Sequence, residues 1–419
     1  MVVGGQIDVE AQPSGRLTDH VGLAVLSNVF RRDLLEEIIN VTGCRERRKR
    51  RLPAHVMIKF VIAMGLYFSE SYQEVLRRLV GSLAVMGSWD DGWQVPASAS
   101  ITEARTRLGV EPLRQLFARA AVPVATTATK GAWLAGRRVM AIDGSALDVA
   151  DTAENAEHFG RLGSGPKASA YPKLALTALV ECGSHACVAA VFGSCRTGER
   201  TQAADFDLLG AVEPGMLVLA DAGFYSWALW HAYARRGADL AWRIGVSVSL
   251  AHLRWLHDGS YLALIFKPGL RAAARRDLQT QAQAGQPVDP DLACVVRVIE
   301  YDLPDRNPDG DLIVLITTVL DPYDIGAPAL AAAYHERWEE ESALKEIKTQ
   351  ILHPGAVLRS KTPDLVTQEM WGILLAHYAI RALMCDAADE AGYDPDRLSF
   401  MGAIRVVRRQ VTDQAATSP

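Results

Sequence analysis

Two aspartates in this chain of 419 residues each follow an apolar run and are followed closely by glycine. Asp143 comes after the run at 139–142, and Asp221 comes after the run at 216–220. A carboxylate at the end of a buried strand is held rigidly at the edge of an open α/β sheet, where such sheets bind ligands. Each aspartate alone is also typical of a turn or a helix cap. Two of them in one sheet favour a metal site.

A third carboxylate lies in the charged stretch YHERWEEESALKEIK at 334–348. Four of its residues stand at positions i, i+3, i+7 and i+14, namely Tyr334, Arg337, Glu341 and Lys348. This spacing predicts one helix face that carries all four side chains. The same pattern also describes a solvated charged helix face with pairs at i,i+4, so spacing alone leaves both interpretations open.

The patterns around these residues divide the chain into four parts. Residues 1–126 have apolar residues at helical spacing and predict a helical domain. Residues 127–246 alternate apolar runs with turns and then with helices, which predicts a mixed α/β sheet. Residues 247–325 contain β-type runs linked by a polar stretch, which predicts a β insertion. Helical spacing returns over 326–419, with an apolar helix at about 364–389.

The composition, with 49% hydrophobic and 22% charged residues, excludes a disordered chain, a collagen and a disulfide-dense miniprotein. The six cysteines include no CxxC pair, and we expect the Cys and His cluster at 182–195 to be buried thiols rather than a zinc site. The first ten residues lack a signal pattern, and the apolar runs are too short to span a bilayer. We therefore expect a soluble, cytoplasmic protein.

The net charge of −5 is unevenly distributed along the chain. Residues 1–126 contain 16 Lys and Arg against 13 Asp and Glu, so this part carries +3 and the remainder −8. The densest basic run is 45–51, and it includes Arg47, Arg48 and Arg50. Such a run is either a solvated loop or a surface that attracts phosphate in a salt-sensitive way. Because the charges are segregated, the net negative charge does not exclude DNA as a partner.

Three segments resemble, in spacing and residue type, the signature regions of the IS4-type DDE transposase family of bacterial insertion sequences. They are DGS at 143–145, DAGF at 221–224 and the Tyr-x2-Arg-x3-Glu-x6-Lys pattern at 334–348. Further similar segments are RRLP at 50–53, ASITEARTRLG at 99–109, and LRSKTP at 358–363 followed by Gln368 and Glu369. The resemblance extends from about residue 20 to 410. It implies an α/β fold with a ribonuclease-H-like mixed-sheet catalytic core and a β-strand insertion, preceded by an all-helical N-terminal domain.

The same resemblance implies a catalytic triad of Asp143, Asp221 and Glu341 that also binds metal. The neighbouring Glu339 and Glu340 lack the family spacing. Three hard carboxylates are suitable ligands for Mg²⁺, for which Mn²⁺ can substitute. Phosphodiester cleavage is served by two such ions about 3.5–4 Å apart, which neutralise the attacking and leaving oxygens.

The implied partner is double-stranded DNA, both the terminal inverted repeats of an insertion sequence and its target. The implied DNA contacts come from two regions of the chain, and they are Tyr334, Arg337 and Lys348 near the triad and Arg47, Arg48 and Arg50 in the N-terminal domain. Arg and Lys are the usual residues that bind phosphate. We further expect a homodimer in the synaptic complex, no membrane association, and a nucleoid location when the protein is bound to DNA.

The function expected from the sequence is therefore a transposase that binds insertion-sequence ends, cleaves them and joins them to target DNA. One alternative is a catalytically inactive, transposase-derived regulator that only binds DNA. Another is a metal-dependent nuclease that cuts without joining. Trp242 and Trp255 are candidates for stacking on a flipped base, although burial in the core is the commoner fate of tryptophan, and we leave both outside the expected site.

Overall fold

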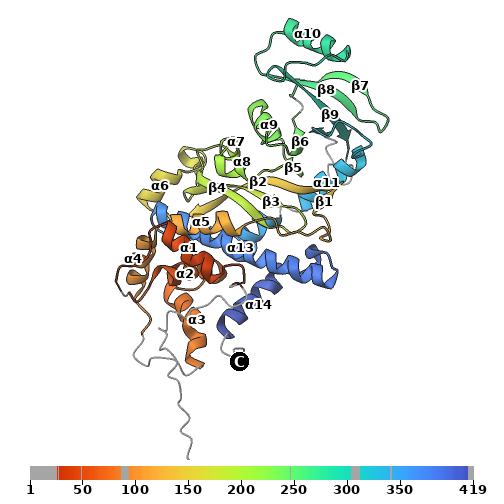
Figure 1. Ribbon diagram of the computed structural model, residues 1–419. Helices are drawn as coiled ribbons and strands as arrows, with labels where there is room; N and C mark the ends of the chain where they lie inside the picture. Colours follow the sequence, from red (N-terminus) through yellow and green to blue (C-terminus); the bar gives the residue numbers. More distant parts are fainter. Residues whose placement is uncertain are drawn as a thin grey trace, which may run out of the picture.

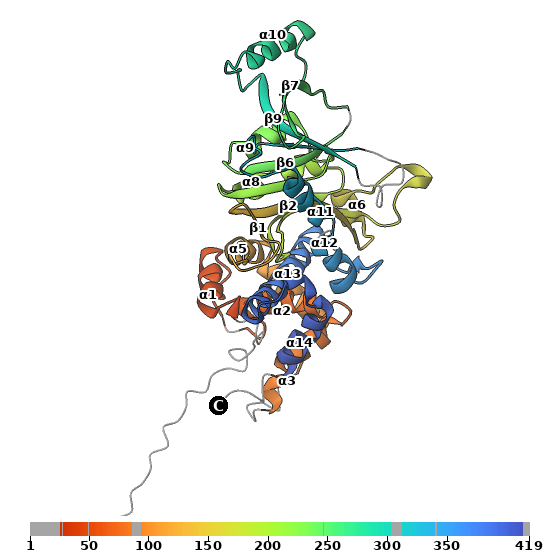
Figure 2. The ribbon, with the colours of Figure 1, turned by 90° about the vertical axis from the view of Figure 1, so that its right-hand side faces the viewer.

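The computed structural model describes residues 26, 28–48, 50–85, 94–245, 247–302, 312–339 and 342–413. Figures 1 and 2 show three parts along one axis: a helical layer at one end, a large sheet in the middle, and a β-rich extension at the other end. Glu341, one of the expected triad residues, lies outside the described residues.

The helical layer contains five helices from the first part of the chain. They are α1 (Arg32–Val41), α2 (Ala54–Leu66), α3 (Tyr72–Val85), α4 (Ser98–Leu108) and α5 (Glu111–Ala120). The apolar stripe expected on α1 is buried, with Leu35, Ile38 and Ile39 in the core. Almost every residue of α2 is buried, so this helix needs neighbours on all of its faces.

The last part of the chain supplies those neighbours. The predicted apolar helix near 364–389 is confirmed as α13 (Pro363–Ala391), which contacts both α2 and α5, and α14 (Phe400–Asp413) contacts α3. In Figure 1, α13 runs between the sheet and the N-terminal helices. At the crossing with α2 the two backbones approach closely, because a Cβ on Gly372 would lie 2.4 Å from the carbonyl oxygen of Val61. The N-terminal and C-terminal helices therefore form one layer.

A buried arginine fastens α4 to the start of α13. Arg105 is fully buried, and its guanidinium donates hydrogen bonds to Gln368 Oε1 (2.8 Å), the Tyr72 hydroxyl (2.7 Å), Ser360 Oγ (3.1 Å) and the Leu365 carbonyl (2.9 Å). Five donors in a rigid fork suit one side chain to several acceptors at once. Two of the segments that resemble the family, at 99–109 and 358–369, thus meet in this network.

The sheet is mixed and continuous. Its strands are β1 (Trp133–Leu134), β2 (Arg137–Val149), β3 (Lys173–Glu181), β4 (Cys187–Ser194), β5 (Met216–Ala220), β6 (Asp239–Ile244), β7 (Ala251–Trp255), β8 (Tyr261–Phe266), β9 (Ala293–Tyr301), β10 (Ile313–Thr317) and β11 (Val357–Leu358). The order is β4-β3-β2-β5-β6-β10-β9-β8-β7, with β1 and β11 also paired to β2. Strands β2, β3 and β4 are antiparallel, whereas β2, β5 and β6 are parallel. This is the ribonuclease-H-like mixed sheet expected from the sequence.

Short helices follow several strands of this core. They are α6 (Ala153–Phe159), a 3₁₀ turn at Gly165–Lys167, α7 (Glu199–Ala203), α8 (Phe206–Gly210) and α9 (Trp227–Ala234). The helices α6, α8 and α9 pack on the core through buried side chains, among them Asn155 of α6, Leu208 of α8 and Trp230 of α9. The connections between the core strands are thus compact and packed.

The β-rich extension pairs with the core sheet through β10, which is antiparallel to β6. Its polar stretch, expected only to link strands, forms a helix, α10 (Ala272–Gln283). The sequence AAARRDLQTQAQ explains this, since Ala, Arg, Leu and Gln are strong helix formers. At the base of the extension, fully buried Arg297 pairs with Asp258. Burial alone would raise the pKa of Asp258, but hydrogen bonds from Ser260 and the Ala327 N–H, together with Arg297, lower it to about 2.

Candidate active site

The two expected aspartates belong to neighbouring strands of the sheet. Strands β2 and β5 pair in parallel, and the last pair of their register is Ala141 opposite Leu219. Asp143 lies two residues further along β2, and Asp221 directly follows the last residue of β5, Ala220. Since side chains alternate along a strand, Asp143 shares a face of the sheet with Ala141.

A backbone amide contacts each of the two carboxylates. Asp143 Oδ1 accepts a hydrogen bond from the N–H of Gly144 (2.8 Å), and Asp221 Oδ1 accepts one from the N–H of Gly223 (2.7 Å). Both aspartates are half-buried, so they are accessible without being loosely solvated.

The helix α11 (Ala327–Glu339) packs on this same face. Leu330 and Tyr334 belong to one buried cluster with Val139 and Ala141 of β2 and Leu219 of β5. The described part of this helix ends two residues before Glu341. Arg337 lies within α11, but its side chain is outside the described part of the structure.

The expected single helix face is not a regular α-helix in the described residues. After α11, the chain forms α12 (Ser342–Glu346) and then a π-helical turn at Ile347–Ile351. Tyr334 is fully buried against the sheet, whereas Lys348, in the π-helical turn, is exposed. The two members of the pattern whose side chains are described therefore have opposite environments. Within the π-helical turn, the side chains of Ile347 and Ile351 are buried in the core.

Segments on both sides of residue 341 are anchored to β2. The preceding helix α11 packs on Val139 and Ala141, as described above. The following helix α12 contacts β2, and β11 pairs in parallel with Asp148 and Val149 at the end of that strand. Strand β2 thus carries Asp143 and positions both flanks of residue 341.

A buried group of charges holds α12 against α13. Glu346 is 5% exposed and pairs with Arg381, whose Nε donates to Glu346 Oε2 at 2.9 Å. His377 Nε2 lies 3.1 Å from the same oxygen. Burial alone would raise the pKa of Glu346, but the hydrogen bond with His377 and the charge of Arg381 lower it, while burial lowers the pKa of His377. The arrangement is therefore an ionised Glu346–Arg381 pair beside a neutral histidine.

This group extends to the turn between β3 and β4. Arg381 lies 2.7 Å from His185 Nδ1, and His185 Nε2 lies 3.1 Å from Asp396 Oδ1. His185 has a φ of 57°, which is unusual for a residue other than glycine, and in this conformation its ring contacts Arg381. Sequence reasoning missed the whole group, because its members come from three distant segments.

Sequence reasoning also missed Glu199 at the start of α7. Its Oε1 occupies space 2.7 Å from where a Cβ of Gly144 would stand, so the glycine accommodates this carboxylate. Burial and then the charge of Asp221 raise the pKa of Glu199. The adjacent Arg200 donates to the Gly223 carbonyl (2.6 Å). The only sequence signal was a charged pair shortly after an apolar strand. By strand alternation, Glu199 approaches β2 from the face opposite Asp143.

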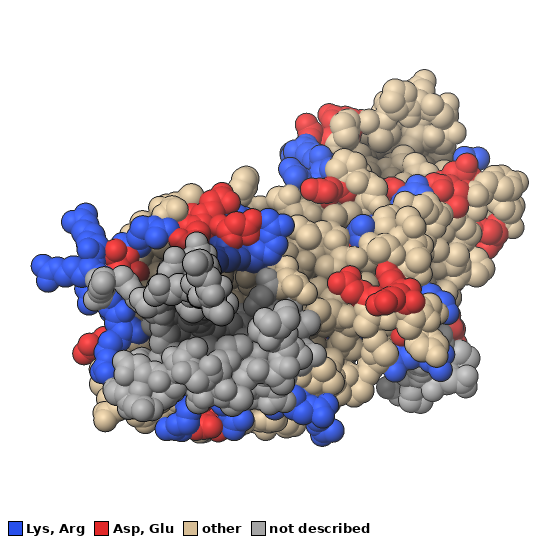
Figure 3. Space-filling model, turned by 60° about the horizontal axis from the view of Figure 1, so that its bottom comes forward, with Lys and Arg blue, Asp and Glu red and all other residues tan. Residues whose placement is uncertain are grey.

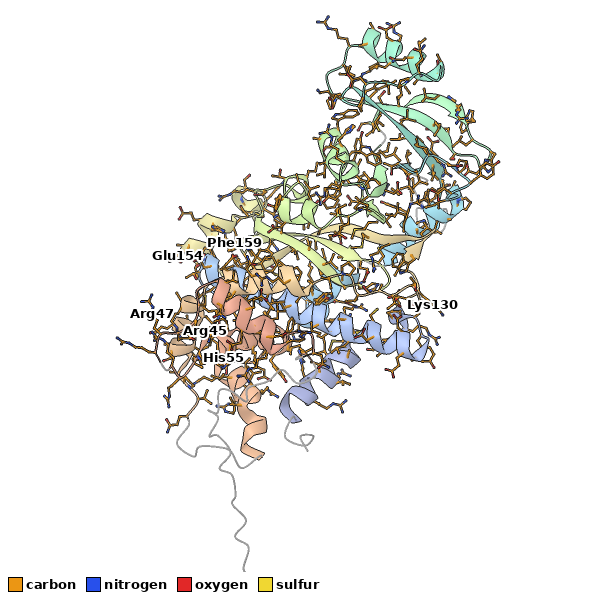
Figure 4. The ribbon with its side chains drawn as sticks, in the orientation of Figure 1. Arg45, Arg47, His55, Lys130, Glu154 and Phe159 are labelled. Carbon is orange, nitrogen blue, oxygen red and sulfur yellow. The ribbon has the colours of Figure 1, made fainter. Side chains whose placement is uncertain are left out.

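Exposed basic residues project from the helical layer. Arg47, Arg48 and Arg50 are all exposed, and no acidic partner pairs with them among the described residues. Arg45, in contrast, pairs with Glu36. Figure 4 shows Arg47 pointing away from the helices, and Figure 3 shows Lys and Arg side chains at that edge of the molecule. Their free charge is available for an anionic partner.

The two tryptophans considered for stacking differ in exposure. Trp242 is fully buried and packs edge-on against Trp230 and Tyr233. Trp255 is 65% exposed on β7, next to Tyr261. Of these two tryptophans, only Trp255 is therefore accessible for stacking on a base.

No zinc-type cluster occurs in the described parts of the chain. Cys182 and Cys187 are buried and Cys195 is half-buried, and all three are free thiols. No group of three or more His, Cys, Asp or Glu in the described residues is arranged to hold a metal ion. Among these residues, Asp143 and Asp221 remain the two expected metal ligands. No helix found within the described ranges is long and apolar enough to cross a membrane.

Comparison with known proteins agrees with this arrangement. Residues 20–118 match the family model for the N-terminal region of the insertion element 4 transposase, and residues 134–379 match the model for the transposase DDE domain. The transposase InsG for insertion sequence element IS4 of Escherichia coli (strain K12) is 28% identical over 95% of this chain and 85% of its own length. The putative transposase InsZ of the same organism is 31% identical over 46% of this chain and 62% of its own length.

A solved structure, the piggyBac transposase synaptic complex with hairpin DNA, aligns with 93% of this chain and 80% of its own chain, at 9% identity and a TM-score of 0.45. The family assignment rests on the domain models, since the DDE domain model covers more than half of the chain and lies on the sheet that carries Asp143 and Asp221. The chain therefore belongs to the IS4-type DDE transposase family.

Proposed function

We propose that this transposase binds insertion-sequence ends, cleaves them and joins them to target DNA by two-metal-ion phosphoryl transfer. The observation that supports this most directly is the parallel pairing of β2 with β5, because Asp143 lies on β2 and Asp221 directly follows β5. Glu341, the proposed third member, follows α11 by two residues. The described segments on both sides of residue 341 contact β2, and this supports Glu341 as the third member.

The donor set at this point fits Mg²⁺ or Mn²⁺. The two aspartates provide hard oxygen ligands, and neither histidine nor cysteine is needed. Asp143, Asp221 and Glu341 would hold two ions, which supply charge neutralisation to the attacking and leaving oxygens of the phosphodiester. Within the chain itself, the Gly144 and Gly223 amides donate hydrogen bonds that orient the two carboxylates.

Phosphate contacts near the triad would come from the end of α11 and the π-helical turn. Lys348 is exposed and can act as a point charge, and Arg337 can bind a phosphate through two hydrogen bonds. Tyr334 is buried against the sheet, so a contact between its hydroxyl and DNA would require a shift of α11 on DNA binding.

End recognition would use the helical layer. We assign Arg47, Arg48 and Arg50 to the DNA backbone, because they are exposed and unpaired within the described chain. Replacing all three with Ala should weaken binding to end-containing DNA and flatten its salt dependence, measured by fluorescence anisotropy across salt concentrations. Wild-type affinity at every salt concentration would contradict the assignment. Because two ends must be joined, we propose a homodimer in the assembled complex.

The central test is an assay of cleavage and strand transfer on a duplex that contains the terminal inverted repeat. Asp143→Ala, Asp221→Ala and Glu341→Ala should each abolish both products while DNA binding remains. Glu339→Ala, two residues before Glu341, is the matched control and should keep both activities. Cutting that survives in any triad variant would refute the triad, and cutting without joined product in the wild type would favour a nuclease. DNA binding without cutting would favour an inactive regulator.

A further inference from the structure

Four cations gather at the outer end of the β-rich extension, and they take part in no step of the proposed function. Lys267 follows β8, Arg271 stands directly before α10, and Arg275 and Arg276 lie within that helix. Arg275 is half-buried and the other three are exposed. The sequence from 267 to 276 contains no carboxylate, and in the described part of the chain the ion pairs of the extension involve other residues. These four residues, named here the α10 cluster, therefore form an uncompensated positive patch.

The stability of α10 gives no reason for these cations. The first turn of the helix contains no acidic residue, and Arg271 at its N-cap makes no side-chain capping hydrogen bond. Positive charges near the start of a helix oppose its dipole, whereas Asp or Glu there would stabilise it. The arrangement therefore costs some helix stability, and this favours a binding role for the charges.

The helix that carries the α10 cluster is fixed on the sheet of the extension. Leu278 is buried in one apolar cluster with residues of β8 and β9. Gln279 Nε2 donates a hydrogen bond to the His252 carbonyl of β7 (3.0 Å). The Arg275 guanidinium lies over the Phe266 ring, 5.5 Å from its centroid. The cations are thus presented from a rigid support, which lowers the entropy cost of binding an anionic partner.

The position of the α10 cluster indicates which part of a DNA substrate it meets. In Figure 1 and in Figure 2, α10 lies at the opposite end of the molecule from the helical layer, and the core sheet lies between them. A duplex that is held by the helical layer and cut at the sheet continues toward the extension on the far side of the cut. Its backbone carries about one negative charge per 1.7 Å of axis, which matches a patch of several cations.

We propose that the α10 cluster binds the phosphate backbone of the DNA that flanks the insertion-sequence end, beyond the cleavage site. This inference rests on the proposed function, which assigns cleavage to the aspartates of the sheet. The three arginines can each bind a phosphate through paired hydrogen bonds, and Lys267 can act as a point charge. Because phosphate contacts carry no sequence information, this surface accepts any flanking sequence.

The test compares two duplexes with the full-length protein. One duplex ends at the outer edge of the terminal inverted repeat, and the other continues for two helical turns into flanking DNA. Binding is followed by fluorescence anisotropy at several salt concentrations in EDTA, so that no cleavage occurs. In the wild type, the slope of log affinity against log salt should be steeper on the flanked duplex by about 3–4, since each phosphate contact contributes about 0.9.

The variant replaces the three arginines with a neutral helix former, as Arg271→Gln, Arg275→Gln and Arg276→Gln together. We expect the slope on the flanked duplex to fall by about 2–3, while binding of the short duplex stays at the wild-type level. Replacing the same three residues with Lys keeps the charge and should keep most of the wild-type slope. If the Gln variant does not fold, Arg271→Gln with Arg276→Gln carries the test with a fall of about 1–2, because both side chains are exposed.

Arg235→Gln is the matched control. Arg235 is an exposed arginine that pairs with Asp291 of the extension at 3.1 Å, and its loss should change the slope on neither duplex. A wild-type slope of the Gln variant on the flanked duplex overturns the proposal. An equal loss on both duplexes also overturns it, since the α10 cluster would then contact the repeat. The proposed function is judged separately, because it fails if the wild type with Mg²⁺ gives no cleavage product, whatever the slopes are.

Discussion

Replacing Arg105 with Met tests whether the N-terminal helices are held to the catalytic part of the chain by one polar network. The change keeps most of the side-chain volume but removes every donor. It leaves four acceptors without their partner, among them Gln368 and Ser360, which are themselves buried. Because Arg105 is fully buried, water cannot easily replace the lost donor, so each unpaired acceptor should cost close to its full desolvation penalty.

The magnitude follows from the contacts. Each hydrogen bond contributes about 1 kcal/mol net, and a buried acceptor left unpaired costs about 1–3 kcal/mol. Removing the guanidinium also removes the cost of burying its charge, and this offsets part of the loss of stability. We therefore expect unfolding to become easier by about 3–5 kcal/mol, a large share of the typical 5–15 kcal/mol that stabilises a folded protein. With a slope of about 3 kcal/mol per M, the urea midpoint would fall by about 1–1.7 M.

The assay is urea unfolding followed by far-ultraviolet circular dichroism and tryptophan fluorescence. Arg107→Met is the matched control, because Arg107 lies on the same helix but is exposed and donates one hydrogen bond, to the Leu52 carbonyl. It should change the stability by no more than about 0.5–1 kcal/mol. If the Arg105 and Arg107 variants unfold at the same urea concentration, the network does not hold the layer together.

Three further predictions concern packing, pH and metal. Gly372→Ala should destabilise the folded chain by about 1–3 kcal/mol, because its Cβ would meet the Val61 carbonyl. Gly210→Ala is the control and should be neutral or slightly stabilising, since there is open space around Gly210. Equal urea midpoints for the two variants would contradict this prediction. The pKa of Asp258 is about 2 when folded and about 4 when unfolded, so its contribution to stability is present above about pH 4 and is lost as the pH falls toward 2. Asp258→Asn should therefore flatten the pH dependence of the urea midpoint between pH 4 and 2, and an unchanged slope would count against it. Removal of divalent metal with EDTA should stop cleavage but not end binding, and added Mn²⁺ should restore it; activity that persists in EDTA would exclude a metal-dependent site.

Much of the local structure could be predicted from the sequence. The stripe on α1, the apolar helix α13 and the strand that ends before Asp221 were visible as hydrophobic patterns. The expectation that the first strand ends at Asp143 was wrong, because β2 stays paired with β3 beyond this residue and continues to Val149. Such patterns report burial and period, and these depend on neighbours in the sequence. Helices and strands with such a pattern could therefore be predicted.

What could not be predicted depends on which distant segments meet. Nothing in the pattern of α2 indicates that its other faces are covered by α13, and nothing near Glu346 indicates a partner at Arg381. The change from α-helix to π-helical turn at Ile347 follows from packing in the assembled core. Glu199 was missed for the same reason, because its significance lies in the space left by Gly144 on another strand.

The joining of the first and last helices into one layer has a consequence for biosynthesis. Roughly 300 residues separate α2 from α13, and a ribosome that adds about 5–20 residues per second needs roughly 15–60 s to make them. During that interval the apolar surface of α2 emerges without the helix that finally covers it. The nascent chain must therefore keep this surface from aggregating, and a product that stops before Pro363 leaves it permanently uncovered.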